Sequence, residues 1–118
     1  MRLLIVAAVA LLPFSAMAAE TATVETVCFT PGGDCTQVIV DQLAAAKREV
    51  LVQAYSFTSP PIAQALVSAK RRGVDVRVIL DKSQRTEKYS GADFLAHGGV
   101  PVLIDAKHAI AHNKVMVI

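Results

Sequence analysis

Short apolar runs alternate with amphipathic segments along most of this 118-residue chain. Residues 74–80 are the clearest example, because valine alternates with charged residues and the run then becomes fully apolar before Asp81. Residues 60–72, just before it, repeat apolar side chains at the spacing of a buried helical stripe. Strands that alternate with helices usually pair in parallel, so this order predicts an α/β fold with a mainly parallel or mixed sheet flanked by helices.

The same patterns place the elements along the chain. We expect helices over about 36–48 and 60–72 and a short helix that ends near His97, with a polar loop at 82–88. The expected strands are 24–29, 50–55, 74–80, 100–104 and a last one that begins near His112.

Two strand ends are candidate positions for a site. Sites in parallel sheets usually lie at the carboxyl ends of strands, and residues 55–58 and 81–82 occupy such ends. Ordinary turn and capping residues are the alternative reading of both segments. The sequence therefore indicates where a site belongs without showing its chemistry.

The first 18 residues have the pattern of a secretory signal peptide. Arg2 precedes an apolar run over 3–12, and residues 16–18 form a small-x-small cleavage site. We expect residues 1–18 to be removed on export to the periplasm or the medium, leaving no transmembrane segment, with an uncleaved anchor as the alternative.

Residues 19–118 suffice for one domain. Removing Arg2 lowers the formal charge from +2 to +1, so net charge does not indicate a nucleic-acid partner.

Cys28 and Cys35 lie on either side of a segment rich in turn residues, 29–34. A turn there can bring the two thiols together, and an exported protein meets an oxidising compartment, so we predict a disulfide. Two reduced thiols or two metal ligands are the alternatives. The metal reading is the weakest, because the paired C-x2-C spacing typical of zinc sites is missing nearby.

His112 and Lys114 stand two residues apart at the head of the last apolar run. Residues i and i+2 of a strand point to the same face, so the imidazole and the ammonium are expected side by side. One side chain can attack phosphorus while the other neutralises the oxygens. Both are therefore candidate catalytic residues, and Lys114 is also a candidate phosphate ligand. A lone His-x-Lys triplet arises often by chance, so its context must support the claim.

In its context the triplet resembles the signature of the phospholipase D superfamily, in particular its small secreted bacterial members similar to the endonuclease branch. The resemblance covers nearly all of residues 19–118. It includes Tyr55-Ser56-Phe57-Thr58, the helix end and strand start Lys70-Arg71-Arg72-Gly73-Val74-Asp75-Val76, Ile79-Leu80-Asp81 and His112-Asn113-Lys114.

One part of the family motif is missing from this sequence. The motif is His-x-Lys, four residues and then Asp; residues 115–118 fill the spacer, and the chain ends where the aspartate is due. The family's downstream Gly-Ser-x-Asn segment is also absent. We therefore interpret residues 19–118 as the N-terminal part of a phospholipase D-like domain in a truncated chain. A genuinely short chain that binds phosphate without turnover is the alternative.

The resemblance implies a phosphodiester hydrolase that acts through a phosphohistidine on His112, without a metal ion or other cofactor. Ser56 is expected to bind substrate. A second histidine must protonate the leaving alcohol, and with one motif per chain it would come from another copy, which implies a homodimer. The resemblance to the compact nuclease branch favours DNA or RNA as substrate, with a phospholipid such as phosphatidylcholine, cleaved to phosphatidate and choline, as the alternative. A non-catalytic periplasmic module that binds phosphate-bearing ligands is the competing hypothesis.

His97 and His108 are the other candidates for the second histidine. His108 stands four residues before His112, a spacing that suits zinc on a helix, but we expect it in a stretch between loop and strand, without an obvious third ligand. His97 has a simpler explanation, because histidine at the C-terminus of a helix interacts favourably with the helix dipole.

Overall fold

The computed structural model describes residues 21–85 and 90–118, and the predicted signal peptide lies outside these residues. The described helices are α1 (Cys35–Ala45), α2 (Pro60–Arg71) and α3 (Gly91–His97), with a short 3-10 helix, η1 (Lys82–Arg85). The strands are β1 (Glu49–Ala54), β2 (Asp75–Asp81), β3 (Val102–Asp105) and β4 (Lys114–Val117).

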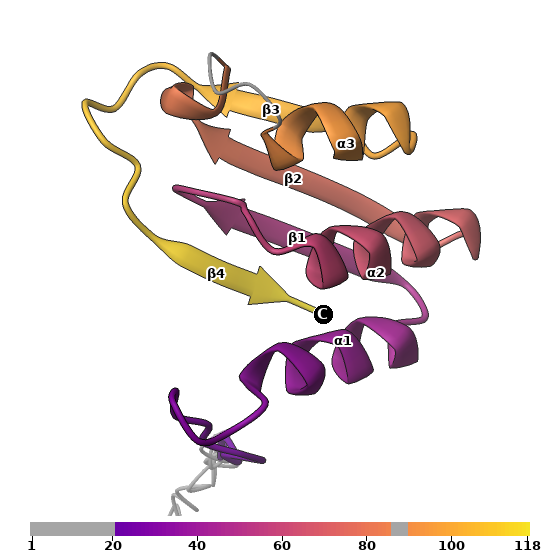
Figure 1. Ribbon diagram of the computed structural model, residues 1–118. Helices are drawn as coiled ribbons and strands as arrows, with labels where there is room; N and C mark the ends of the chain where they lie inside the picture. The colour runs from indigo at the N-terminus through magenta and orange to yellow at the C-terminus, as the bar shows by residue number, and fades with distance from the viewer. Residues whose placement is uncertain (1–20, 86–89) are drawn as a thin grey trace, which may run out of the picture.

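The four strands form one mixed sheet in the order β3-β2-β1-β4 (Figure 1). β1 pairs with β2 and β2 with β3 in parallel, whereas β4 runs antiparallel to β1. The predicted α/β class with a mainly parallel or mixed sheet is confirmed. The carboxyl ends of the three parallel strands thus meet at one edge, and the chain re-enters the sheet there at the start of β4.

The three α-helices cover one face of the sheet, as Figure 1 shows. Alternate residues of each strand point toward them, and Val50, Val76 and Leu80 are fully buried. Leu43, Leu66 and Leu95 bring one buried leucine from each helix into the same core. Side chains alternate between the two faces of a strand and repeat about every 3.6 residues around a helix. Each element therefore buries one face or one stripe of apolar side chains, and these meet in a single layer.

The opposite face of the sheet is largely uncovered by the described residues. One row of cross-strand partners on this face runs over all four strands and consists of Leu103, Ile79, Gln53 and Val115. Leu103 is 67% exposed and Val115 54% exposed. Three of the four side chains in this row are apolar, and exposed apolar side chains gathered on an open face are unusual for a monomeric protein surface.

Cys28 and Cys35 form the predicted disulfide, and Cys35 is also the first residue of α1. Just before it, the Asp34 side chain accepts a hydrogen bond from the backbone N–H of Gln37, at 3.0 Å. This is N-cap geometry. The disulfide and the cap together connect the preceding segment to the start of the helix.

Several expected boundaries were wrong. Residues 24–29 form no strand, and Val24, Val27 and Phe29 are exposed, because no strand or helix of the described residues covers them. The expected helix 36–48 ends at Ala45, the expected loop at 82–88 begins as η1, and the strand expected at 100–104 begins at Val102. Within residues 21–85 and 90–118, no helix has the length and apolar character needed to cross a membrane.

Candidate active site

Tyr55 follows the last residue of β1, and its ring contacts both candidate catalytic side chains. The ring of His112 meets it edge to face, with ring centroids 4.6 Å apart. The Lys114 Nζ lies 5.8 Å from the centre of the same ring, within the range of a cation–π contact. The structure therefore gathers His112 and Lys114 around one aromatic ring at the strand ends.

His112 does not lie on a strand, in contrast to the expectation from its spacing. β4 begins at Lys114, and the Asn113 N–H donates to the Ala111 carbonyl at 3.0 Å, which places His112 at the centre of a tight three-residue turn. The two basic side chains thus approach each other through a turn and a shared ring rather than through strand alternation. Both remain exposed to solvent.

The turn is attached to the sheet on both sides of His112. The Tyr55 N–H donates to the Asn113 carbonyl at 2.9 Å, from the end of β1. The Ala111 N–H donates to the Asp81 carboxylate Oδ2 at 2.8 Å, at the end of β2. Both flanking residues are therefore held by the carboxyl ends of two parallel strands.

Asp81 is a buried carboxylate, 2% exposed. Its Oδ1 accepts a second backbone hydrogen bond, from the Ser83 N–H at 2.9 Å. Two backbone hydrogen bonds lower the pKa of Asp81, because both stabilise the charged form. The bond from Ala111 has the larger effect and the bond from Ser83 the next largest. The side chain is thus an anion held by backbone donors.

Asp105 ends β3 and is the cross-strand partner of Asp81. It accepts hydrogen bonds from the backbone N–H groups of Lys107 and His108, and its Oδ2 lies 2.5 Å from His108 Nδ1. The contact with His108 is the main cause of the lowered pKa of Asp105. His108 is therefore paired within the β3–β4 connection, and its ring is largely exposed.

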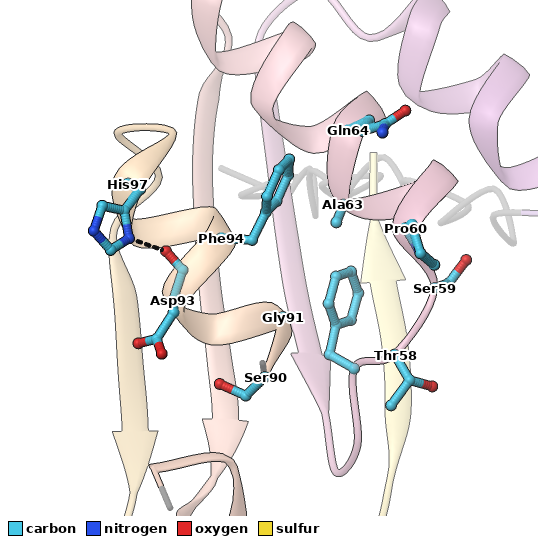
Figure 2. Close-up of a pocket in the computed structure, with 11 residues that line it drawn as sticks. Thr58, Ser59, Pro60, Ala63, Gln64, Ser90, Gly91, Asp93, Phe94 and His97 are labelled. Atoms are coloured by element: carbon cyan, nitrogen blue, oxygen red, sulfur yellow. Dashed lines mark hydrogen bonds between the residues drawn. The ribbon is translucent and has the colours of Figure 1, made fainter. Parts of the chain in front are cut away.

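The described residues contain two cavities beside these strand ends. Ser56 and Lys114 both line one of about 420 Å³, between α1 and the β1–β4 pair. The other, of about 630 Å³, lies between α2 and α3, and its lining combines the rings of Phe57 and Phe94 with polar side chains. Figure 2 shows Phe94 beside Ser90 and Asp93 in this lining. Lys114 therefore lines one of these cavities, whereas His112 lines neither.

His97 is the last residue of α3, as its sequence context predicts. Its Nδ1 lies 2.7 Å from the Asp93 carbonyl, one turn earlier in the same helix (Figure 2). In the part of the chain that the structure describes, no three His, Cys, Asp or Glu side chains gather as a metal site would require. The sequence missed the contacts of Tyr55 and Asp81, although it marked both strand ends as candidate positions.

Fold and site geometry together fit a known class of phosphodiesterase-like domains. Residues 39–118 match the family model described as "Cardiolipin synthase, PLD-like domain", where PLD stands for phospholipase D. The match extends over more than half of the chain. The chain therefore belongs to the phospholipase D-like family.

Individual relatives place the chain more closely. A phospholipase D of Rickettsia prowazekii is 42% identical over 91 residues, which cover 77% of this chain and 44% of the relative. A mitochondrial cardiolipin hydrolase of Drosophila melanogaster is 35% identical over 80 residues, covering 68% of this chain and 32% of the relative. The chain thus spans less than half the length of these curated relatives.

Solved structures share the fold. Nuc from Salmonella typhimurium, a phospholipase D family member, superposes with a TM-score of 0.68 at 34% identity, over 75% of this chain and 60% of that one. NucT from Helicobacter pylori gives a TM-score of 0.60 at 26% identity, over 70% of this chain and 58% of that one.

Proposed function

We propose that this chain is part of a metal-independent phosphodiester hydrolase in which His112 is the nucleophile and Lys114 binds the phosphate. The observation that carries the proposal is the approach of both side chains to the Tyr55 ring, on a domain of the phospholipase D-like family. An imidazole beside an ammonium suits attack on phosphorus, because the cation stabilises charge on the non-bridging oxygens.

The proposed reaction has two steps. A nitrogen of neutral His112 forms a bond to phosphorus while the bond from phosphorus to the leaving alcohol oxygen breaks, which yields a phosphohistidine. A second histidine protonates that oxygen, then takes a proton from water, whose oxygen attacks phosphorus and releases His112. We propose that this second histidine belongs to another copy of the chain, so that a homodimer completes the site.

The substrate is proposed to be a nucleic acid, with a phospholipid as the alternative. Lys82 and Lys107 follow the cross-strand partners Asp81 and Asp105, and Lys114 begins β4 at the same edge. All three lysines are exposed. A cationic edge attracts a polyanion, and phosphate contacts dominate the affinity of proteins for nucleic acids. Ser56, which shares a cavity with Lys114, is a proposed substrate-binding residue.

Export to the periplasm or the medium is also part of the proposal. It is supported by the Cys28–Cys35 disulfide, because disulfides persist in oxidising compartments. Residues 1–18 would direct that export, and residues 19–118 would form the N-terminal part of the hydrolase domain.

The test uses protein expressed from the complete coding sequence, assayed in EDTA on plasmid DNA, RNA and phosphatidylcholine vesicles. We expect turnover to persist in EDTA, and His112→Ala to lower it at least about 100-fold, as expected for loss of a nucleophile. Lys47→Ala is the control, since it removes an exposed basic side chain between α1 and β1, at the opposite end of the parallel strands from the candidate site. Loss of all activity in EDTA, or full activity in His112→Ala, would overturn the mechanism. Phosphate-ligand binding without turnover would favour a binding module instead.

A further inference from the structure

We propose that Asp81 is a positioning residue for His112, because its carboxylate holds the backbone of the residue just before the histidine. This inference rests on the proposed role of His112 as the nucleophile. It concerns a side chain that touches neither phosphate nor the reacting imidazole in the proposed scheme.

The placement of Asp81 is unusual for a charged residue. Acidic side chains are rarely fully buried unless paired or fully hydrogen-bonded, yet Asp81 is 2% exposed at the end of a central strand. One of its oxygens caps the local backbone at Ser83, two residues on. The other reaches the Ala111 N–H, 30 residues later in the chain. The local cap needs only one oxygen, so the long-range bond requires a separate explanation.

That long-range bond acts directly on the segment that presents the nucleophile. Ala111 is buried at 8% exposure, and the turn that it starts, closed by Asn113, has His112 at its centre. With Asn113 held by the N–H of Tyr55, the Asp81 bond supplies the second attachment point. One attachment point on each side of His112 restrains the position of the three-residue turn, and misplacing a reacting group by about 1 Å can cost about 100-fold in rate.

The charge of Asp81 suits this role. An ionised carboxylate offers acceptors on both oxygens, whereas an amide offers one oxygen and an alanine none. The hydrogen bonds from Ala111 and Ser83 and the nearby charge of Lys82 all lower the pKa of Asp81, so the group remains an acceptor at neutral pH. Asp81→Asn should therefore retain one of the two bonds, and Asp81→Ala neither.

The experiment compares Asp81→Asn, Asp81→Ala and His112→Ala in protein from the complete coding sequence, with bis(p-nitrophenyl) phosphate as the diester probe. Asp75→Asn is the matched control, because Asp75 begins the same strand, is exposed and pairs with Arg77 instead. Rates are corrected for the folded fraction from thermal unfolding, and exchange of the Ala111 amide hydrogen is followed by NMR.

We expect kcat to fall by about 10-fold or more in Asp81→Ala and by less in Asp81→Asn, with KM changed less than about threefold. Exchange of the Ala111 amide should accelerate in the same order, and Asp75→Asn should match the wild type.

If His112→Ala abolishes turnover while folded Asp81→Ala keeps its kcat, the positioning role of Asp81 is wrong and the role of His112 as the nucleophile is retained. If His112→Ala keeps full activity, the proposed function fails and the positioning role with it. Unchanged Ala111 exchange in Asp81→Ala would also overturn the inference.

Discussion

At the scale of single residues, Tyr55 connects the two basic side chains of the proposed site. Its ring offers a face to the Lys114 ammonium and a contact to the edge-to-face His112 ring, while its backbone N–H holds Asn113. Such ring contacts contribute about 0.5–1.5 kcal/mol each beyond the area they bury. The ring, rather than the hydroxyl, is the part of Tyr55 that these contacts use.

Tyr55→Leu should therefore lower turnover of the diester probe by about 10-fold, because loss of the two ring contacts loosens His112 and Lys114 together. Tyr55→Phe is the matched control and should stay within about threefold of the wild type, since it keeps the ring. Steady-state rates at saturating substrate make the comparison. Equal losses in both variants would assign the effect to the hydroxyl and contradict this view of the ring.

A second residue-scale prediction concerns pH. The pKa of Asp81 in the folded protein lies below its ordinary value. The ionised side chain therefore stabilises the protein at pH values above the pKa of the unfolded chain, and this stabilisation is lost as the pH falls through the pKa of the folded protein. The free energy of unfolding should decline from about pH 5 downward, and Asp81→Asn should decline less steeply because one contributor is absent. Urea denaturation at a series of pH values measures both slopes. Identical slopes would show that Asp81 does not contribute. Asp75 and Asp105, whose pKa values are also lowered, should contribute to the slope in both proteins.

At the scale of elements, the start of α3 fits closely against the loop after β1. A Cβ atom added to Gly91 would lie 2.5 Å from both the Phe57 carbonyl oxygen and Phe57 Cδ1. Because the carbonyl belongs to the backbone, neither rotation of a side chain nor a small shift relieves that overlap. A glycine is thus required where α3 meets the loop of residues 55–59.

Gly91→Ala should destabilise the protein by about 1–3 kcal/mol, as overpacking of a close contact does, despite the better helix propensity of alanine. Ala96→Ser, at an exposed position of the same helix, is the control. It should lower the free energy of unfolding by only about 0.5 kcal/mol. Chemical denaturation of both variants gives the comparison. A Gly91→Ala protein as stable as the wild type would mean that α3 can move away from Phe57 without cost.

The elements also show why some predictions from sequence succeeded. Residues 60–72 and 74–80 carry strong local periodicity, and α2 and β2 begin and end within two residues of those bounds. Residues 24–29 have strand-forming composition as well, but a strand needs a neighbour to accept its hydrogen bonds. Whether a neighbour exists is decided by the rest of the fold, so composition alone was misleading there.

At the scale of the whole molecule, no helix among residues 21–85 and 90–118 covers the second face of the sheet. The row Leu103, Ile79, Gln53 and Val115 crosses that face. Val117, also exposed, adds apolar surface on β4, the strand at one end of the sheet order. Exposed apolar strands at a sheet edge promote association between chains.

We therefore expect a protein limited to residues 19–118 to self-associate and to be poorly soluble. The double variant Leu103→Lys/Val115→Lys should shift it toward monomer, because two charges on the open face oppose stacking. Ser68→Lys/Ala96→Lys, which adds the same charge on exposed helix positions, is the control. Sedimentation velocity distinguishes the species. A soluble wild-type monomer that unfolds cooperatively would contradict the prediction.

The sequence by itself determined the α/β class, the positions along the chain of β1, β2, β3 and the helices, the disulfide, and His112 and Lys114 as candidate site residues. These depend on local periodicity, capping, turn composition and a short motif, all carried by neighbouring residues. Only the tertiary structure decided the antiparallel direction of β4, the turn at His112, and the contacts of Tyr55 and Asp81. Those features join segments far apart in the chain, and such pairings leave no periodic signal in the residues that make them.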